Sequence, residues 1–368
     1  MDINKKIVMT VSGIRPDFIR MSEIFKKLDE KFNHILVHTG QHYDELLSGV
    51  FFKDLNIRKP DFTLNTGANG GTHYNQLSYL STAIIDLIKN ENLKPDIILF
   101  LGDSNTVCAS LPLRKEGYMI GHIEAGMRSF DKKMLEELNR TTCDHCSHIL
   151  FVYHNDYKQY LKNENIKDNV HVVGNTIVEV CKPHIKPHVE KRNDVILVDI
   201  HRPENFKFES RMVNILNYAN MCSLKYNLPV KMLKFHGTCK AIDEYNLELG
   251  TIEMVDLMSY TDYLNTVHHC KFLISDSGTG QEEPAMFNTP VIVPRDYTER
   301  PQSVEANCSF MLNVNNRKMI GVQYNQNNQK SFDYLDDIFN KTIKMDTSWL
   351  GTGETSTIIV NELELFLQ

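Results

Sequence analysis

Short apolar runs alternate with longer amphipathic stretches along most of the chain. In the first half, the apolar runs predict strands over Lys6–Ser12, His34–Thr39, Asp96–Leu101, Tyr118–Ile123, His148–Tyr153 and Val170–Val173. The stretches between them predict helices, such as those over Phe18–Leu28, Tyr74–Asn90 and Asp156–Asn163. Apolar strands that alternate with helices are typical of βαβ units, in which helices cover both faces of a parallel sheet.

The polar segment Lys182–Asn193, which contains two prolines, interrupts this alternation and is the best candidate for a linker. The alternation then resumes with predicted strands over Asp194–Ile200, Val230–Phe235, Ile252–Val255, Phe272–Ile274 and Val291–Val293. Because 368 residues are many for one domain, we expect two doubly wound α/β domains. Their predicted bounds are residues 1–184 and 194–350, with a terminal helix in residues 351–368.

The composition indicates a globular protein, with 42% hydrophobic and 24% charged residues. A net charge of −7 without a basic cluster argues against nucleic acid as a partner. No segment has the length of a membrane span, and the N-terminal apolar stretch is too short for a signal peptide, so we expect a cytoplasmic protein without a membrane partner. Cys143 and Cys146 have the spacing of zinc ligands, but no second such pair is near, and buried free thiols are the preferred interpretation.

Polar and ionisable residues lie at or just beyond the ends of several predicted strands. They are Arg15 and Arg20 after the first strand, Gln41 and His42 after the second, Asp103, then His122 and Glu124, and His201 in the second half. Open α/β sheets bind their ligands beyond the carboxyl ends of the strands. We therefore expect these side chains to line a site in a cleft between the two domains.

The stretch SDSGTGQEEPAMFNTPVIVPRDYTER, residues 275–300, carries the clearest signal of ligand chemistry. A predicted strand enters a turn that contains Ser277, Gly278 and Thr279, and a helix is expected over Gln281–Phe287. Such a turn directs backbone N–H groups and the positive end of a helix at an anion, most often phosphate. Glu282 and Glu283 open the expected helix, and one of them could accept hydrogen bonds from a sugar. The pattern therefore predicts a ligand with a diphosphate and a sugar.

Eight motifs occur in a specific order: GIRPDFIR, HTGQHYD, GDSNT, HIEAGMRSFD, EELNR, HRPENF, SDSGTGQEEP and RDYTERP. In their order and spacing the chain resembles the non-hydrolysing UDP-N-acetylglucosamine 2-epimerase family, from about Met9 to the segment 351–356. The resemblance implies two Rossmann-like domains arranged as in the B-type glycosyltransferases, with the terminal helix packing back toward the first domain. It also implies a homodimer and no metal or other cofactor.

The resemblance further implies inversion of C2 in a UDP-linked 2-acetamido sugar, by elimination of UDP to a glycal and re-addition. Asp103, Glu124 and Glu136 resemble the acid/base carboxylates of the family, and His201 matches a histidine near the diphosphate. The implied contacts to UDP or sugar involve Arg15, Arg20, Gln41, His42, Arg140, His236, Ser277, Gly278, Thr279, Glu282, Glu283 and Arg295.

Simpler interpretations compete with these roles. Glu136 and Arg140 stand four residues apart and could form an ordinary helix salt bridge, and Asp103 could cap a helix that begins at Ser104. A glycosyltransferase of the same fold would share the diphosphate site without needing the carboxylates. A hydrolysing epimerase would share the glycal but release UDP and free sugar.

Departures from the usual motifs bear on the substrate. The chain has Asp17 in place of Glu, Arg20 in place of Lys, Gly278-Thr279 in place of a double glycine, and a short loop over residues 129–135. Of these, the short loop and Arg20, together with the GDSN form and the segment Phe51–Asp61, look like the branch of capsule and O-antigen enzymes. We therefore expect a UDP-N-acetyl-6-deoxy-L-hexosamine such as UDP-N-acetyl-L-rhamnosamine, with conversion of UDP-N-acetylglucosamine to UDP-N-acetylmannosamine as the alternative.

Overall fold

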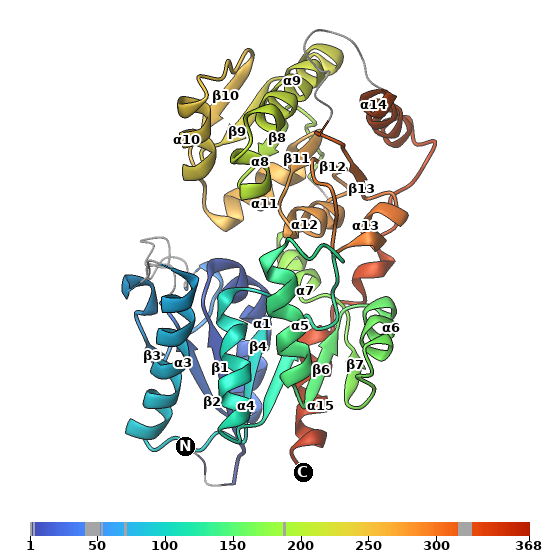
Figure 1. Cartoon of the computed structure of the whole chain (residues 1–368). Coiled ribbons are helices and arrows are strands. Elements are labelled where there is room, and N and C mark those ends of the chain that lie inside the picture. Colours follow the sequence, from blue (N-terminus) through green and yellow to red (C-terminus); the bar gives the residue numbers. More distant parts are fainter. Residues whose placement is uncertain are drawn as a thin grey trace. The chain divides into compact units, whose positions relative to one another are not determined.

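A computed structural model describes residues 2, 4–40, 52, 54–69, 72–186, 189–315 and 326–368 (Figure 1). The chain divides into two compact units, which we describe separately. Unit 1 comprises Met1–Val180 and Leu350–Gln368, and unit 2 comprises Cys181–Trp349. Gln41, His42 and part of the segment Phe51–Asp61 lie outside the described residues, so the structure does not test the predictions made for them.

The described residues of unit 1 form a seven-stranded parallel sheet with the strand order β3-β2-β1-β4-β5-β6-β7. Its strands are β1 (Ile7–Ser12), β2 (Asn33–His38), β3 (Phe62–Thr63), β4 (Ile97–Leu101), β5 (Ile120–Ile123), β6 (Ile149–Val152) and β7 (Val170–Val172). Its helices are α1 (Arg15–Lys31), α3 (His73–Asn90), α4 (Ser110–Lys115), α5 (Leu135–Cys146), α6 (Asn155–Asn163), α7 (Ile177–Cys181) and α15 (Thr355–Phe366), with short 3-10 turns η2 (Thr66–Asn69) and η3 (Asn105–Ala109).

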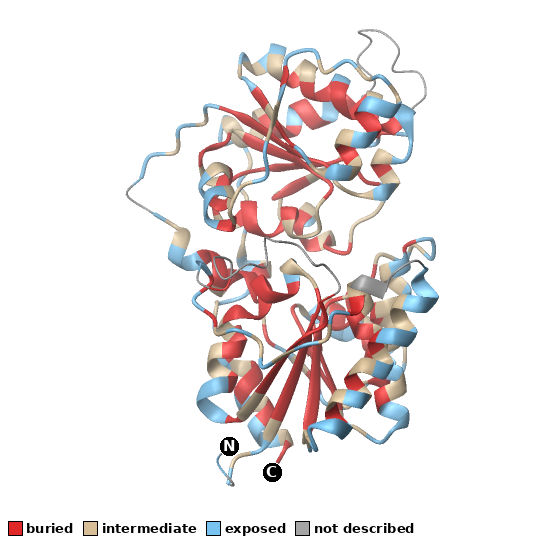
Figure 2. Ribbon diagram, turned by 90° about the vertical axis from the view of Figure 1, so that its left-hand side faces the viewer, coloured by how far each residue is buried: buried red, intermediate tan, exposed pale blue. Residues whose placement is uncertain are grey.

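The two faces of this sheet are covered by different helices because neighbouring strand residues point to opposite sides. Met9 and Val11 of β1 pack in one core cluster with residues of α3, α4 and α5. Helix α1 contacts β1 and β2 as well as α15. Both faces of the strands are therefore buried, as Figure 2 shows by their red colour between helices with exposed outer sides.

Unit 2 repeats this architecture with a six-stranded parallel sheet in the order β10-β9-β8-β11-β12-β13. Its strands are β8 (Ile196–Asp199), β9 (Val230–Leu233), β10 (Ile252–Val255), β11 (Phe272–Ser275), β12 (Val291–Val293) and β13 (Ser309–Met311). Its helices are α8 (Pro203–Phe206), α9 (Glu209–Tyr226), α10 (His236–Glu244), α11 (Tyr260–His269), α12 (Glu283–Met286), α13 (Pro301–Glu305) and α14 (Gln326–Phe339), with 3-10 turns η4 (Lys182–His184), η5 (Thr279–Gln281) and η6 (Ser348–Leu350).

The α/β fold with two parallel sheets confirms the predicted fold class. Each predicted strand is present, with ends that differ by no more than two residues from the prediction. The strands β3 and β13 were missed, since two or three residues at the end of a sheet leave little periodic pattern. The helix expected over Gln281–Phe287 is instead a 3-10 turn followed by the four-residue helix α12, which is a correction to the prediction.

The terminal helix α15 packs in unit 1, where Lys31 of α1 forms an ion pair with Glu364 at 2.8 Å. The backbone N–H and the hydroxyl of Ser356, near the start of α15, donate to the carboxylate of Glu179 at 3.0–3.3 Å. Within the described part of the chain, no helix combines the length and apolar character that crossing a lipid bilayer would require.

Candidate functional site

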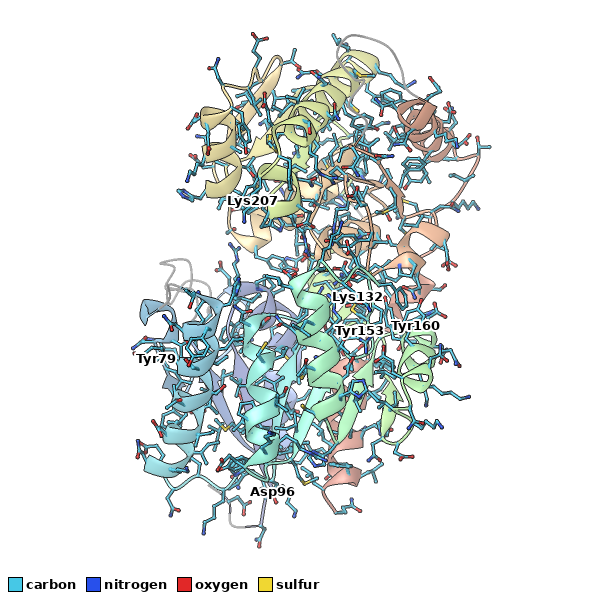
Figure 3. All side chains as sticks on the ribbon, viewed as in Figure 1. Tyr79, Asp96, Lys132, Tyr153, Tyr160 and Lys207 are labelled. Atoms are coloured by element: carbon cyan, nitrogen blue, oxygen red, sulfur yellow. The ribbon has the colours of Figure 1, made fainter. Side chains whose placement is uncertain are left out.

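The chemically active residues of unit 1 lie at the carboxyl edge of its sheet. Because β1, β4 and β5 run parallel, the residues that follow them gather at one edge. In Figure 3 this edge carries Lys132 and Tyr153, which follow β5 and β6, whereas Asp96, which precedes β4, lies at the opposite edge. The carboxylates that follow β4 and β5 therefore lie at the edge marked by Lys132 and Tyr153.

Asp103, which follows β4, forms an ion pair with Arg140 of α5. The other arm of this guanidinium donates to Glu137 at 2.7 Å. Asn139 of the same helix donates to the backbone carbonyl of Asp103 at 2.9 Å. Helix α5 therefore holds both the side chain and the backbone of this residue. The ion pair between Asp103 and Arg140, which the sequence did not reveal, leaves 30% of the Asp103 side chain exposed.

Glu124, which follows β5, forms a buried ion pair with Arg20 of α1, and each side chain is 5% exposed. The backbone of Glu124 has a φ of +67°, a left-handed conformation that is uncommon for a residue with a side chain. A Cβ atom added to Gly102 would lie 3.7 Å from Oε1 of Glu124, so the loops that follow β4 and β5 are neighbours. Asp103 and Glu124, two of the three predicted acid/base carboxylates, are thus each paired with a different arginine.

Asp17 is a third carboxyl group at this edge, and its role is not evident from the sequence alone. Its Oδ2 accepts hydrogen bonds from the N–H groups of Gly13 and Ile14, at 2.9 and 3.1 Å, and the side chain is buried. Burial raises the pKa of Asp17 to about 7, although the two N–H donors act in the opposite direction. The residue orders the turn between β1 and α1, on which Arg15 lies half-buried.

Glu136 is half-buried in the first turn of α5, and no hydrogen bond or ion pair engages it among the described residues. The salt bridge considered between Glu136 and Arg140 does not form, because Arg140 pairs with Asp103 and Glu137 instead. The carboxylate of Glu137 also accepts from the N–H groups of Ser129 and Phe130 at 2.9 Å. Glu136 and Glu137 stand four and three residues before Arg140, so either spacing allows a helix salt bridge. Spacing alone could not show that Glu137 is the partner.

In unit 2, His201 follows β8 and is held by two aspartates. Its Nδ1 lies 2.9 Å from Asp199 and 3.7 Å from Asp276. Burial acts to lower the pKa of His201, but the two carboxylates outweigh it, so the pKa is raised. The side chain of His201 remains 34% exposed. This edge of unit 2 therefore presents an imidazole whose protonated form is favoured by two carboxylates.

The turn after β11 is ordered by small residues. Ser275 Oγ accepts from the N–H of Ser277 at 3.0 Å, and the hydroxyls of Ser277 and Thr279 lie 3.2 Å apart. A Cβ atom at Gly280 would meet Ser275 Oγ at 2.5 Å, so this position requires glycine. All three predicted diphosphate-binding residues are half-buried at the turn, Gly278 among them.

Glu283 and Glu282 differ in their surroundings. Glu283 accepts a hydrogen bond of 2.8 Å from the buried hydroxyl of Tyr260, a partner that the sequence did not reveal. Glu282 is fully buried and forms an ion pair with Arg300. The carboxylate of Glu282 thus neutralises an interior guanidinium, and its predicted contact with substrate stays a prediction.

Arg295 and His236 also have contrasting positions. Arg295 is buried and makes two hydrogen bonds to Glu299, at 3.1 and 3.2 Å, and its expected contact with substrate stays a prediction. His236 is exposed at the start of α10, directly beyond the β9 strand. Its position at the carboxyl edge agrees with a role in binding.

One cluster in the described part of the chain has the geometry to offer three ligands to a metal ion, namely Asp199, His201 and Asp276, whose ligand atoms lie within 4.8 Å of one another. Asp276 uses both carboxylate oxygens to accept from the N–H groups of His201 and Arg202, at 2.9 and 3.1 Å. It also accepts from the amide of Asn205 at 2.9 Å. Asp276 of this cluster thus orders the loop after β8 through its hydrogen bonds to His201, Arg202 and Asn205.

Comparisons with known proteins agree with this geometry. The chain matches the family model described as UDP-N-acetylglucosamine 2-epimerase over residues 26–364. A UDP-N-acetylglucosamine 2-epimerase of Methanococcus maripaludis is 32% identical over 376 residues, covering 95% of this chain and 96% of that protein. A UDP-2,3-diacetamido-2,3-dideoxy-D-glucuronate 2-epimerase of Pseudomonas aeruginosa is 30% identical over 368 residues, covering 97% of this chain and 99% of that protein. The crystal structure of a Methanocaldococcus jannaschii UDP-GlcNAc 2-epimerase, in complex with UDP-GlcNAc and UDP, matches with a TM-score of 0.85 at 29% identity, covering 98% of this chain and 99% of that one.

Proposed function

The chain belongs to the UDP-N-acetylglucosamine 2-epimerase family, a family of isomerases, and from this premise we propose that it inverts the configuration at C2 of a UDP-linked 2-acetamido sugar. The observation that carries the proposal is the pair of neighbouring carboxylates, Asp103 and Glu124, each held by its own guanidinium. No carbonyl group acidifies the C2 proton of such a sugar. The reaction therefore needs positioned proton-transfer groups together with a leaving group on C1.

In the proposed reaction, one carboxylate removes the proton from C2 while the bond between C1 and the phosphate oxygen breaks. The electrons of the C2–H bond form a double bond between C1 and C2, and the electrons of the C1–O bond leave with UDP. A second group then protonates the opposite face of C2, and the phosphate oxygen adds back to C1. Each positioned proton-transfer group contributes roughly 10²–10⁴ in rate. Glu136, which has no partner among the described residues, is the third candidate for this work.

Residues of unit 2 bind the UDP that leaves and returns. The side chain of His201, whose pKa is raised by two carboxylates, suits the negative charge that develops on the departing diphosphate. The hydroxyls of Ser277 and Thr279 and the backbone at Gly278 offer further hydrogen bonds. Glu283, oriented by Tyr260, accepts the ribose hydroxyls. From unit 1, Arg15 completes the set, because a planar guanidinium can bind phosphate through two hydrogen bonds.

The substrate that we propose is a UDP-N-acetyl-6-deoxy-L-hexosamine such as UDP-N-acetyl-L-rhamnosamine. Arg20, the GDSN form, the segment Phe51–Asp61 and the short loop over residues 129–135 support it, since these features look like the branch of capsule and O-antigen enzymes. The P. aeruginosa relative, named for a modified UDP-sugar, supports this branch as well. The M. maripaludis relative supports UDP-N-acetylglucosamine as the second candidate. A homodimer and a cytoplasmic role in surface-glycan synthesis are further parts of the proposal.

Proton NMR in D₂O tests the reaction with UDP-N-acetylglucosamine and, separately, UDP-N-acetyl-L-rhamnosamine. We expect deuterium at C2 and a second anomeric UDP-sugar signal. Asp103→Asn should lower the exchange rate by roughly 10²–10⁴, whereas Asp168→Asn, at an exposed position, should not change it. Release of UDP with free sugar would show a hydrolysing epimerase. Absence of exchange with both sugars, or full exchange in Asp103→Asn, would refute the proposed assignment.

A further inference from the structure

His122 of β5 is fully buried, and both nitrogens of its ring face hydrogen-bond acceptors. Nδ1 lies 2.7 Å from Oδ1 of Asp144, and Nε2 lies 2.8 Å from the backbone carbonyl of Gly102. A backbone carbonyl has no proton to donate, and the carboxylate of Asp144 is also paired with Arg128 at 2.7 Å. Both ring nitrogens therefore donate, which makes the side chain an imidazolium cation.

The buried charge of this cation is balanced by its surroundings. Burial acts to lower the pKa of His122, but Cys143 and Asp144 outweigh it, so the pKa lies well above the ordinary value. Contact with His122 and Arg128 lowers the pKa of Asp144 despite its burial. Arg128 continues the network to Glu164, with two hydrogen bonds of 2.7 Å. Two cations and two carboxylates thus alternate from the interior to the half-exposed Glu164.

The inner end of this network is attached to the backbone on both sides of the carboxylate pair. The imidazolium donates to the carbonyl of Gly102, the residue directly before Asp103. The carboxylate that binds the imidazolium accepts from the N–H of Gly126, two residues after Glu124, at 3.2–3.3 Å. Gly102 and Gly126 have φ angles of +75° and +77°. The network therefore joins two loops whose backbone is in left-handed conformations.

These attachments define how the two carboxylates are placed relative to each other. Glu124 itself has a φ of +67°, a conformation that persists only where surrounding contacts hold it. Its neighbour Ala125 is fixed by a hydrogen bond from its N–H to the carbonyl of Phe151 at 3.0 Å. The loop after β4 has its own contact to α5 through Asn139. The N–H of Gly102 donates to the carbonyl of Ile123 at 3.0 Å, and the buried pair of His122 and Asp144 adds a side-chain connection between the two loops.

We propose that His122 and Asp144 are positioning residues that hold the loops of Asp103 and Glu124 in register for proton transfer at C2. The inference rests on the proposed function, because it assigns the two loops to that reaction. A displacement of about 1 Å in a reacting group can lower a rate roughly 100-fold. Loss of the pair should therefore reduce the rate of chemistry and leave the affinity for UDP, which is bound mainly by unit 2, almost unchanged.

Two substitutions of His122 separate the two hydrogen bonds. In His122→Gln the amide nitrogen reaches the position of Nε2 and can still donate to Gly102, whereas in His122→Asn it reaches the position of Nδ1 and can still donate to Asp144. We expect each to lower the C2 exchange rate by roughly 10- to 100-fold with little change in the dissociation constant of UDP. Glu164→Gln is the matched comparison, since it alters the outer end of the network at Arg128 and leaves the contacts of His122 with Gly102 and of Asp144 with Gly126 in place.

Nitrogen-15 NMR of the wild-type protein with labelled histidine provides a readout that does not depend on the activity of any variant. The signals that His122→Gln removes should show two protonated nitrogens around neutral pH, since both ring nitrogens face acceptors and the pKa of His122 is raised. A neutral ring at this pH would overturn the proposal. It would equally be overturned if both His122 variants kept the wild-type exchange rate, or if UDP affinity fell as much as the rate. Absence of exchange in the wild-type protein would instead refute the proposed function, while the NMR signature would still decide the charge of His122.

Discussion

Replacing Asp17 by asparagine should make the stability of unit 1 less dependent on pH. The carboxyl group of Asp17 is buried and accepts two backbone N–H groups through a single oxygen, Oδ2. The second oxygen can therefore carry a proton without loss of these hydrogen bonds. Burial raises the pKa of Asp17 from the ordinary 3.8 to about 7 in the folded protein. An asparagine side chain keeps one oxygen acceptor for both N–H groups and cannot ionise.

The sign of the effect follows from proton linkage. Since the folded state binds this proton more tightly than the unfolded state, the stabilisation is complete below pH 3.8 and is lost as the pH rises through about 7. A tenfold change in an equilibrium constant corresponds to about 1.4 kcal/mol. The free energy of unfolding of the wild type should therefore fall by about 4 kcal/mol relative to the variant, with a slope that approaches about 1.4 kcal/mol per pH unit.

Urea unfolding between about pH 4 and pH 8 measures this difference. The two compact units need not unfold together, so the exchange of β1 backbone amides should be followed as a report on unit 1. Any cost of the added amide N–H₂ is the same at every pH and does not alter the slope. Asp168→Asn, at an exposed position, is the control and should follow the wild type. A stability difference between Asp17→Asn and wild type that stays constant across the pH range would refute the reasoning.

Three further predictions concern single side chains. Asp199→Asn removes a carboxylate that raises the pKa of His201, so the alkaline decline of the C2 exchange rate should move to lower pH; an unchanged pH profile would contradict this. Gly280→Ala places a Cβ atom 2.5 Å from Ser275 Oγ, and calorimetry should show UDP affinity reduced at least tenfold, or about 1.4 kcal/mol. Asn227 has a φ of +52° at the end of α9, so Asn227→Ala should cost about 1–2 kcal/mol in urea unfolding, whereas Asn227→Gly should not show this loss.

The sequence predicted the fold well because a parallel sheet covered on both faces needs strands that are apolar throughout. β4, with the sequence IILFL, has every residue buried, and so has β12. Such runs stand out in a sequence without any knowledge of which strand pairs with which. β3 and β13 lacked this signal, because they are short and partly exposed at the ends of their sheets.

The candidate residues of the site were predicted from motifs, but their partners were not. Spacing within α5 could not tell that Arg140 pairs with Glu137 and Asp103, rather than with Glu136. Nor could the adjacent Glu282 and Glu283 be separated, although one is a buried ion-pair partner. Which of two adjacent side chains forms an ion pair depends on the direction in which each points, and tertiary packing decides that direction.

The sequence by itself determined the two α/β units, the parallel sheets and the residues that follow the strands, since periodicity and residue type are local properties. Only the tertiary structure decided that Asp144 of α5 reaches His122 of β5 and that Arg20 of α1 reaches Glu124. These groups are far apart in the chain, and sheet order brings them together. A buried charge requires a partner of opposite charge. No local sequence pattern predicts which partner that is, yet the partner determines the chemistry at the carboxyl edge of the unit 1 sheet.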